Sequence, residues 1–237
     1  MSRLPIVDPQ ALIVVEGPDG CGKTTISTVL RDALQAKTLR LWTRVADPSS
    51  GPVGQVIRNF LLAGGSSDLQ ALGYLFFADR IHELPRWWLP CVVADRYLLS
   101  TWVYQAGVMP DDILLAAIGD IRLRAPDVVV LLDVDEPTCI ARSASRRGTP
   151  ECFDGAAAIV RNRARYLEAW QTGGIGGRCL TDPRLRQSVY GDHQIHIRPR
   201  ADADPHAVVQ HILEKLDQLE SKSPALAAAL APELPIA

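Results

Sequence analysis

Residues 17–24 constrain the fold of this chain more than any other feature. They read Gly-Pro-Asp-Gly-Cys-Gly-Lys-Thr, which fits the pattern GxxxxGK[ST]. An apolar, β-branched run precedes them at 11–15, and apolar residues at helical spacing follow. The glycines let several backbone N–H groups converge, and the start of the following helix adds its positive dipole end. The segment therefore predicts a phosphate-binding loop, or P-loop, between a buried strand and a helix.

A P-loop predicts ATP and Mg²⁺ as ligands. Lys23 should reach the transferring phosphate, and the Thr24 hydroxyl should hold Mg²⁺. Two later strand-like runs end in acids, Asp95 and Asp133, and either carboxylate could be the acidic partner of the metal. The chain contains no Asn-Lys-x-Asp sequence for guanine recognition, which argues against a GTPase. We expect the nucleotide to be bound by Gly17, Pro18, Asp19, Gly20, Cys21, Gly22, Lys23, Thr24 and Thr25.

Strand and helix patterns alternate along the rest of the chain. Further strands are expected at 38–43, 91–94, 128–132 and 194–197, and helices at 53–63, 69–84, 111–123, 137–146, 156–171 and 205–219. Such alternation predicts an α/β fold, with a mostly parallel five-stranded sheet flanked by helices.

Two segments fit this alternation poorly. Residues 172–192 are rich in glycine and turn residues, so we expect an extended connection there. Residues 223–237 are rich in alanine and proline, which predicts a loosely ordered C-terminal tail. The folded domain is therefore expected to cover residues 1–222.

Composition excludes several other classes of protein. A net charge of -2 gives no electrostatic reason to expect nucleic acid or a membrane as a partner. The five cysteines are scattered and form no CxxC pair, which argues against a disulfide framework or a zinc site. No apolar run is long enough to cross a bilayer, and no signal peptide is visible. We expect a cytoplasmic location.

Three further segments accompany the P-loop in order. Residues 76–80 read Phe-Phe-Ala-Asp-Arg, residues 95–105 read Asp-Arg-Tyr-Leu-Leu-Ser-Thr-Trp-Val-Tyr-Gln, and residues 131–135 read Leu-Leu-Asp-Val-Asp. Together the four segments resemble the thymidylate kinase family of nucleoside monophosphate kinases, over roughly residues 12–170. The resemblance implies a three-layer P-loop kinase fold with a short lid, transfer of the ATP γ-phosphoryl group to dTMP, and a homodimer.

The resemblance also implies an acceptor site. Phe76 would stack on the thymine ring and Arg80 would hydrogen-bond its edge. Tyr104 would lie near the sugar and disfavour a ribose 2′-hydroxyl. Asp19 would contact the sugar 3′-hydroxyl or order water near the metal. The remaining acceptor residues implied are Ser100 and Thr101 at the base, with Arg44 and Arg96 at the phosphate.

The metal and lid residues follow from the same resemblance. Asp95, beside Arg96 at the end of a strand, is the expected partner of Thr24 at the magnesium. Some family members carry an arginine where this chain has Gly20, so the lid should supply that positive charge. The candidates are Arg142, Arg146 and Arg147, of which Arg146 and Arg147 are favoured as catalytic residues beside Lys23, Arg96 and Asp19.

Other functions remain open, and one departure from the family pattern bears on them. The family often has an acid and a proline directly after the Thr-Arg pair, whereas residues 45–51 here read Val-Ala-Asp-Pro-Ser-Ser-Gly. This difference could mean another or a modified pyrimidine deoxynucleotide as the acceptor. A nucleoside kinase would need a base, for which Glu16 is the candidate. A P-loop ATPase or switch that uses Asp133 and phosphorylates nothing is the third alternative.

Overall fold

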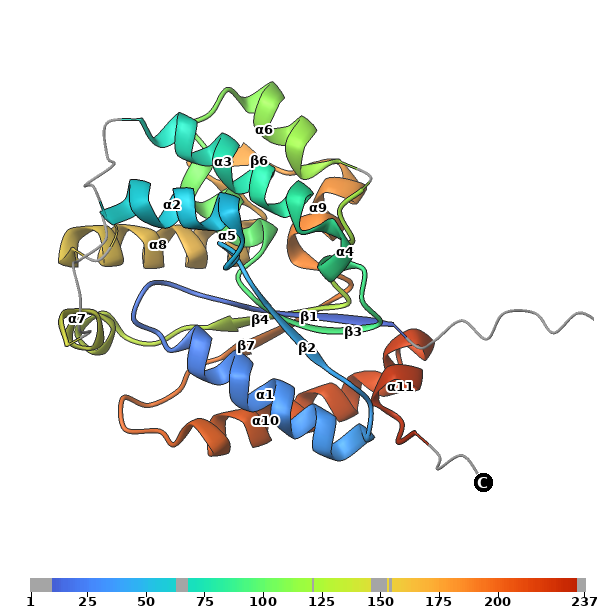
Figure 1. Cartoon of the computed structure of the whole chain (residues 1–237). Helices are drawn as coiled ribbons and strands as arrows, with labels where there is room; N and C mark the ends of the chain where they lie inside the picture. The colour runs from blue at the N-terminus through green and yellow to red at the C-terminus, as the bar shows by residue number, and fades with distance from the viewer. Residues whose placement is uncertain (1–9, 63–67, 121, 146–152, 154, 234–237) are drawn as a thin grey trace, which may run out of the picture.

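The computed structural model describes residues 10–62, 68–120, 122–145, 153 and 155–233. They form a central sheet with helices on both faces, as Figure 1 shows. Neighbouring strands are all parallel. The sheet order is β2-β3-β1-β4-β7, formed by β1 (Ala11–Glu16), β2 (Thr43–Ala46), β3 (Cys91–Asp95), β4 (Val128–Leu132) and β7 (His193–Ile197). The predicted parallel five-stranded α/β fold is confirmed.

Each face of the sheet has its own hydrophobic core. On β1, Ile13 and Val15 pack into one core, while Leu12 and Val14 pack into the other. This alternation explains why the run is apolar throughout, because both faces of the strand are covered.

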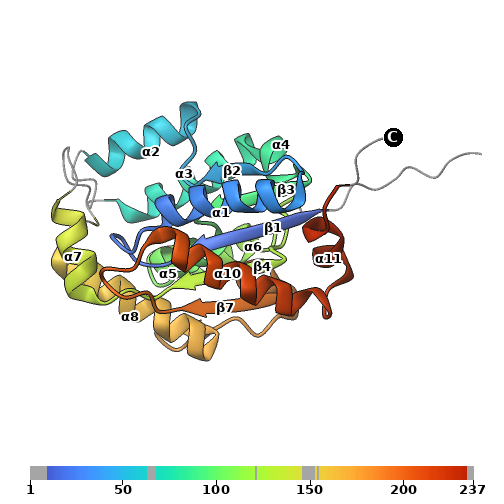
Figure 2. The same cartoon turned by 90° about the horizontal axis from the view of Figure 1, so that it is seen from below.

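The helices divide between these two faces. Helices α1 (Lys23–Thr38), α10 (Pro205–Glu220) and α11 (Pro224–Leu230) lie together on one face (Figure 2). The other helices lie over the opposite face or at the sheet's end; they are α2 (Pro52–Leu62), α3 (Leu69–His82), α4 (Leu84–Trp87), α5 (Leu98–Gln105), α6 (Asp111–Ile118), α7 (Glu136–Ala144), α8 (Ala156–Thr172) and α9 (Pro183–Tyr190).

The second strand begins later than the sequence predicts. Residues 38–43 were expected to be extended, but α1 continues to Thr38 and β2 begins at Thr43. The Trp42 indole N–H donates to the Thr38 hydroxyl at 3.0 Å, and the Trp42 side chain is buried. The apolar pattern that suggested a strand therefore reflects a tryptophan anchored under the end of α1, while Leu39 and Leu41 are exposed.

Both segments that fitted poorly contain regular structure. Residues 172–192 form a hairpin of β5 (Gly174–Ile175) and β6 (Arg178–Cys179), followed by α9, so the predicted extended connection is wrong there. The Asp182 side chain caps α9 and Pro183 occupies its first turn, which is a helix-start signal.

The predicted loose tail is also wrong for residues 224–230. They form α11, and its Leu226, Ala229 and Leu230 are buried against the core beneath α1 and α10. Across the described ranges, no helix combines the length and apolar character that crossing a membrane requires.

Candidate functional site

The P-loop and the 95–105 segment meet at the carboxyl ends of two adjacent strands. Val15 on β1 lies in register with Asp95 on β3, so the chain leaves both strands at the same edge. Gly22 caps α1 with a φ of 97°, a left-handed conformation that favours glycine. The loop therefore places the amino end of α1 at this edge of the sheet.

The P-loop lines a large cavity. Gly20, Gly22, Lys23, Thr24 and Thr25 all contribute to its wall. The Lys23 ammonium donates to the carbonyl oxygens of Gly17 and Pro18, at 2.8 and 2.7 Å. The lysine is thus held against its own loop, at the wall of the cavity.

Cys21 contributes to this loop mainly through its backbone. Its side chain is buried, and burial raises the pKa of the thiol, so the sulfur stays protonated. Six of the nine predicted nucleotide-site residues line the P-loop cavity, and Gly17, Pro18 and Cys21 do not.

Thr24 and Asp95 form an oxygen-rich pair beside the loop. The Thr24 hydroxyl donates to Asp95 Oδ2 at 2.7 Å, and both residues line the P-loop cavity. Hard oxygen donors of this kind suit Mg²⁺, which typically takes one or two protein ligands and completes its shell with phosphates and water. Within the described residues, no cluster of three or more His, Cys, Asp or Glu side chains could hold a metal ion by itself.

Asp133, the alternative acid, is occupied by other partners. It accepts hydrogen bonds from Arg163 and Arg198, each at 2.7 Å, and lies 3.3 Å from a nitrogen of His196. Asp133 does not line the P-loop cavity, whereas Asp95 does. The geometry therefore favours Asp95 over Asp133 as the partner of Thr24.

Arg44 lies beside the Thr24–Asp95 pair. Its guanidinium contacts Asp95 Oδ2 at 2.5 Å and the Ser27 hydroxyl at 2.8 Å, and it does not line the P-loop cavity. The side chain thus points from β2 toward α1, and its contact with an acceptor phosphate stays a prediction. Arg58 of α2 lies at the cavity wall instead.

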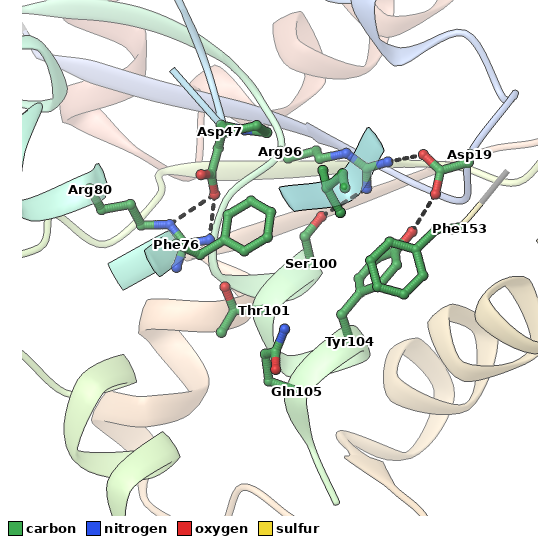
Figure 3. A pocket seen from close by; sticks show the side chains of 12 residues that line it. Asp19, Asp47, Phe76, Arg80, Arg96, Ser100, Thr101, Tyr104, Gln105 and Phe153 are labelled. Atoms are coloured by element: carbon green, nitrogen blue, oxygen red, sulfur yellow. Dashed lines mark hydrogen bonds and ion pairs between the residues drawn. The ribbon is translucent and has the colours of Figure 1, made fainter. Parts of the chain in front are cut away.

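A second cavity, the acceptor cavity, adjoins the first. Helices α3 and α5 each contribute one wall (Figure 3). Phe76 and Arg80 of α3 are one helical turn apart and share a face, as do Ser100 and Tyr104 of α5. The five residues predicted for the base and sugar are all in its lining: Phe76, Arg80, Ser100, Thr101 and Tyr104.

Sequence reasoning missed several residues of this cavity. Asp47, Pro48, Leu61, Gln105 and Phe153 also line it. The acid-proline pair at 47–48 and the glutamine after Tyr104 were visible signals. The contributions of Leu61 and Phe153 depend on tertiary packing and had no such signal.

An ion pair closes one side of the acceptor cavity. Arg80 Nε donates to Asp47 Oδ2 at 2.9 Å, and Nη2 contacts the same oxygen. Burial raises the pKa of Asp47 to about 6, because desolvation of the carboxylate outweighs the attraction of Arg80. Arg80 Nη1 is buried and has no hydrogen-bond partner among the described residues. A buried N–H of this kind is suited to a ligand's acceptor atom.

Asp79 fixes the segment that carries Asp47. Its carboxylate accepts from the Ser49 backbone N–H at 2.6 Å and from the Ser49 hydroxyl at 2.7 Å. The longer 45–51 segment of this chain therefore still delivers an acid and a proline to the cavity wall.

Arg96 and Asp19 stand where the two cavities meet. Both residues line both cavities, and their side chains form an ion pair. The Tyr104 hydroxyl donates to Asp19 Oδ2 at 2.8 Å. Burial and the nearby Asp19 carboxylate raise the pKa of Tyr104, so its hydroxyl remains a donor.

Gly20 is held close to α7. It has a φ of 82°, and an added Cβ would lie 2.1 Å from the Cys139 carbonyl oxygen. An arginine at this position is therefore excluded both by backbone conformation and by the neighbouring helix.

Among the lid candidates, only Arg142 lies within the described residues. Arg146 and Arg147 fall outside them. Arg142 Nη2 donates to the Ala201 carbonyl at 2.8 Å, and the side chain lines both the P-loop cavity and a neighbouring cavity of ≈ 310 Å³. Thr25, Pro199 and Pro205 line that third cavity too, so it continues from the P-loop toward α10.

Comparison with known proteins assigns the family. A family model described as thymidylate kinase matches residues 15–175. A probable thymidylate kinase of Pyrobaculum aerophilum is 32% identical over 163 residues, which are 66% of this chain and 81% of the relative. A thymidylate kinase of Xanthomonas campestris pv. campestris is 34% identical over 200 residues, 81% and 85% of the two chains.

A solved structure shows the same fold. The thymidylate kinase of Candida albicans matches with a TM-score of 0.67 at 19% identity, over 91% of this chain and 94% of that one. With the family model matching more than half of its length, the chain belongs to the thymidylate kinase family.

Proposed function

We propose that this chain transfers the γ-phosphoryl group of Mg²⁺-bound ATP to the 5′-phosphate of dTMP. One observation carries the proposal: a P-loop cavity and an aromatic, hydrogen-bonding cavity meet at Arg96 and Asp19. A transferase for two nucleotides needs this arrangement, because both phosphates must be held at one point. The names of the relatives support dTMP as the acceptor.

ATP occupies the donor side. The backbone N–H groups of residues 20–25 and the Lys23 ammonium bind its phosphates, while Thr24 and Asp95 hold the metal. Bound Mg²⁺ supplies neutralisation of the phosphate charge. The adenine extends into the cavity beside Arg142, whose guanidinium suits stacking on a flat base.

The monophosphate occupies the acceptor side. Its base lies against Phe76, and Arg80 Nη1 donates to its edge. Tyr104 and Asp19 contact the deoxyribose and leave no room for a 2′-hydroxyl. Arg96, which lines both cavities, binds the phosphate, and Arg58 lines the adjoining P-loop cavity, from which it could assist.

The chemistry needs positioning rather than a strong base. An oxygen of the acceptor phosphate attacks the γ-phosphorus, the bond from that phosphorus to the β–γ bridging oxygen breaks, and ADP leaves. The attacking phosphate is already anionic near neutral pH. Lys23, Arg96 and a lid arginine, Arg146 or Arg147, neutralise the charge that develops.

The test is a coupled ADP-release assay with a panel of acceptors. We expect turnover with dTMP, weaker turnover with dUMP, and little with dCMP or UMP. The panel should include a dUMP analogue with a larger 5-substituent, since a preference for it would indicate a modified pyrimidine as the natural acceptor. ADP release no faster with dTMP than without an acceptor would rule the proposal out.

A homodimer and a cytoplasmic location belong to the same proposal. Helices α2, α3 and α6 lie on the same side of the sheet (Figure 1), and each carries an exposed apolar residue, Val56, Tyr74 and Ile113 respectively, which suits a subunit interface. The described cysteines are free thiols, as in a reducing compartment. Light scattering after size-exclusion chromatography tests the dimer, for which a monomer mass would be contrary evidence.

A further inference from the structure

A fully buried carboxylate, Glu16, lies directly behind the phosphate-binding arginine of the acceptor site. It is 0% exposed and forms the last residue of β1. We propose that Glu16 is a positioning residue that sets the orientation of Arg96 toward the acceptor phosphate. This inference rests on the proposed function, because it concerns how the same site binds a monophosphate.

Glu16 first fixes the backbone that directly follows Arg96. Arg96 has a φ of 72°, a left-handed conformation that is unfavourable for a residue with a side chain. Its N–H is bound to the Val15 carbonyl at 3.0 Å. Glu16 Oε1 accepts from the N–H groups of Tyr97 and Ser100, at 2.7 and 3.0 Å.

These two bonds also replace a missing helix cap. Tyr97 precedes α5 and provides no side-chain cap. A carboxylate at the amino end of a helix satisfies free N–H groups and interacts favourably with the helix dipole. Glu16 performs this role from a different strand, and it thereby ties the start of α5 to the end of β1.

The second oxygen of Glu16 acts on the Arg96 side chain through two hydroxyls. Oε2 accepts from the Ser100 hydroxyl at 2.6 Å and from the Tyr166 hydroxyl at 3.1 Å. Arg96 Nη1 donates to the same two hydroxyls, at 3.2 and 3.3 Å. Glu16 therefore fixes the position of Arg96 Nη1 through these hydroxyls, while Arg96 Nη2 faces Asp19 and the cavities.

The same contacts exclude Glu16 as a general base. Its two oxygens accept four hydrogen bonds, and it is absent from the linings of both the P-loop cavity and the acceptor cavity. A base must come within hydrogen-bond reach of the proton that it removes. The carboxylate that a nucleoside kinase would need is therefore committed to holding Arg96.

The test compares two ligands that differ only in the phosphate. Thymidine uses the base and sugar contacts, whereas dTMP also uses Arg96. For Glu16→Gln we expect the affinity for dTMP, measured by calorimetry, to fall about 10- to 100-fold, as when one or two hydrogen bonds to a charged group are lost. The affinity for thymidine should change less than about twofold. The ratio of the Kd for thymidine to the Kd for dTMP therefore reports on phosphate binding alone, and it should fall in Glu16→Gln.

Asp127→Asn is the matched control. The Asp127 carboxylate also accepts a backbone N–H, from Leu12 of β1 at 2.7 Å, but it lies at the opposite end of that strand from Glu16. Its substitution should lower the free energy of unfolding and leave the ratio unchanged. Tyr166→Phe removes one of the two hydroxyls and should lower the ratio by a smaller factor; it decides the question if Glu16→Gln does not fold.

Several results would overturn the inference. An unchanged ratio in folded Glu16→Gln, or equal losses for thymidine and dTMP, would show that Glu16 has only a structural role. These outcomes leave the proposed function standing as long as the wild type phosphorylates dTMP. A wild type that turns over no monophosphate would instead refute the proposed function itself.

Discussion

At the scale of single residues, the sequence predicted the site wherever a role depends on local spacing. The P-loop residues and the Phe76–Arg80 pair lie where expected because a loop and a helical turn fix their geometry. The contact of Arg44 with Asp95 had no local signal, because the direction of a side chain on β2 depends on the register of that strand. Arg58 had no local signal, since only the packing of α2 brings it to the cavity.

Gly20 provides a residue-scale prediction. Gly20→Ala should lower the free energy of unfolding by about 1–3 kcal/mol for the positive φ, and by about 1–3 kcal/mol more for the contact with Cys139. Affinity for ATP should fall as the P-loop shifts. Chemical denaturation and calorimetry measure the two effects.

The control for Gly20 is Gly177→Ala. Gly177 has a φ of 78°, but an added Cβ would meet nothing within 4 Å. It should therefore show the conformational cost alone. Equal losses for the two variants would mean that α7 moves freely away from the P-loop.

The Asp47–Arg80 pair provides a prediction about pH. The pKa of Asp47 is raised from 3.8 to about 6, so the folded protein binds its proton more tightly than the unfolded chain does. This group's contribution to stability therefore decreases as pH rises from about 4 to about 6. Ligand binding should respond in the opposite direction, because only the ionised carboxylate holds Arg80 firmly.

Thymidine is the ligand for this measurement, since it carries no phosphate that titrates in the same range. Its affinity for the wild type should fall as pH drops through about 6. Asp47→Asn should bind thymidine more weakly and with little dependence on pH. A wild-type affinity for thymidine that does not change with pH would show that Asp47 has no part in base recognition.

At the scale of elements, the sequence was reliable where one periodic pattern filled a whole element. Strand β4 and helices α8 and α10 lie within a residue or so of their predicted bounds. Short elements were missed because their stability comes from partners elsewhere in the chain. Helix α11 is the clearest case. Ser223 caps it and Pro224 occupies its first turn, but its alanine-rich sequence gave no apolar periodicity, and it is stabilised by packing on α1 and α10.

The packing of α11 can be tested with one leucine. Leu226 is 0% exposed, so Leu226→Ala should cost about 2–5 kcal/mol of unfolding free energy. The kinetics for both nucleotides should stay unchanged, because α11 lies away from the site. Leu41→Ala makes the same substitution at a residue that is 79% exposed, and should cost less than about 0.5 kcal/mol. Similar losses at both positions would contradict the buried placement of α11.

At the scale of the whole molecule, the sequence predicted the parallel sheet but not the order of its strands. Alternating strands and helices restrict the connections to crossovers, and both faces of the sheet must then be covered. Several orders satisfy these rules. In the observed order, β1 lies between β3 and β4, and all three strands contribute side chains to both cores.

The central position of β1 has a consequence for the dynamics of the protein. Its backbone is hydrogen-bonded to a neighbour on each side, so its amides should exchange with deuterium only when the whole domain unfolds. Amides of the short β5–β6 hairpin should exchange sooner, through local opening. Exchange followed by mass spectrometry measures both, and early exchange at 13–15 would count against this view. The P-loop directly follows this strand. Local unfolding at the edge of the protein should therefore leave the conformation of the phosphate-binding loop unchanged.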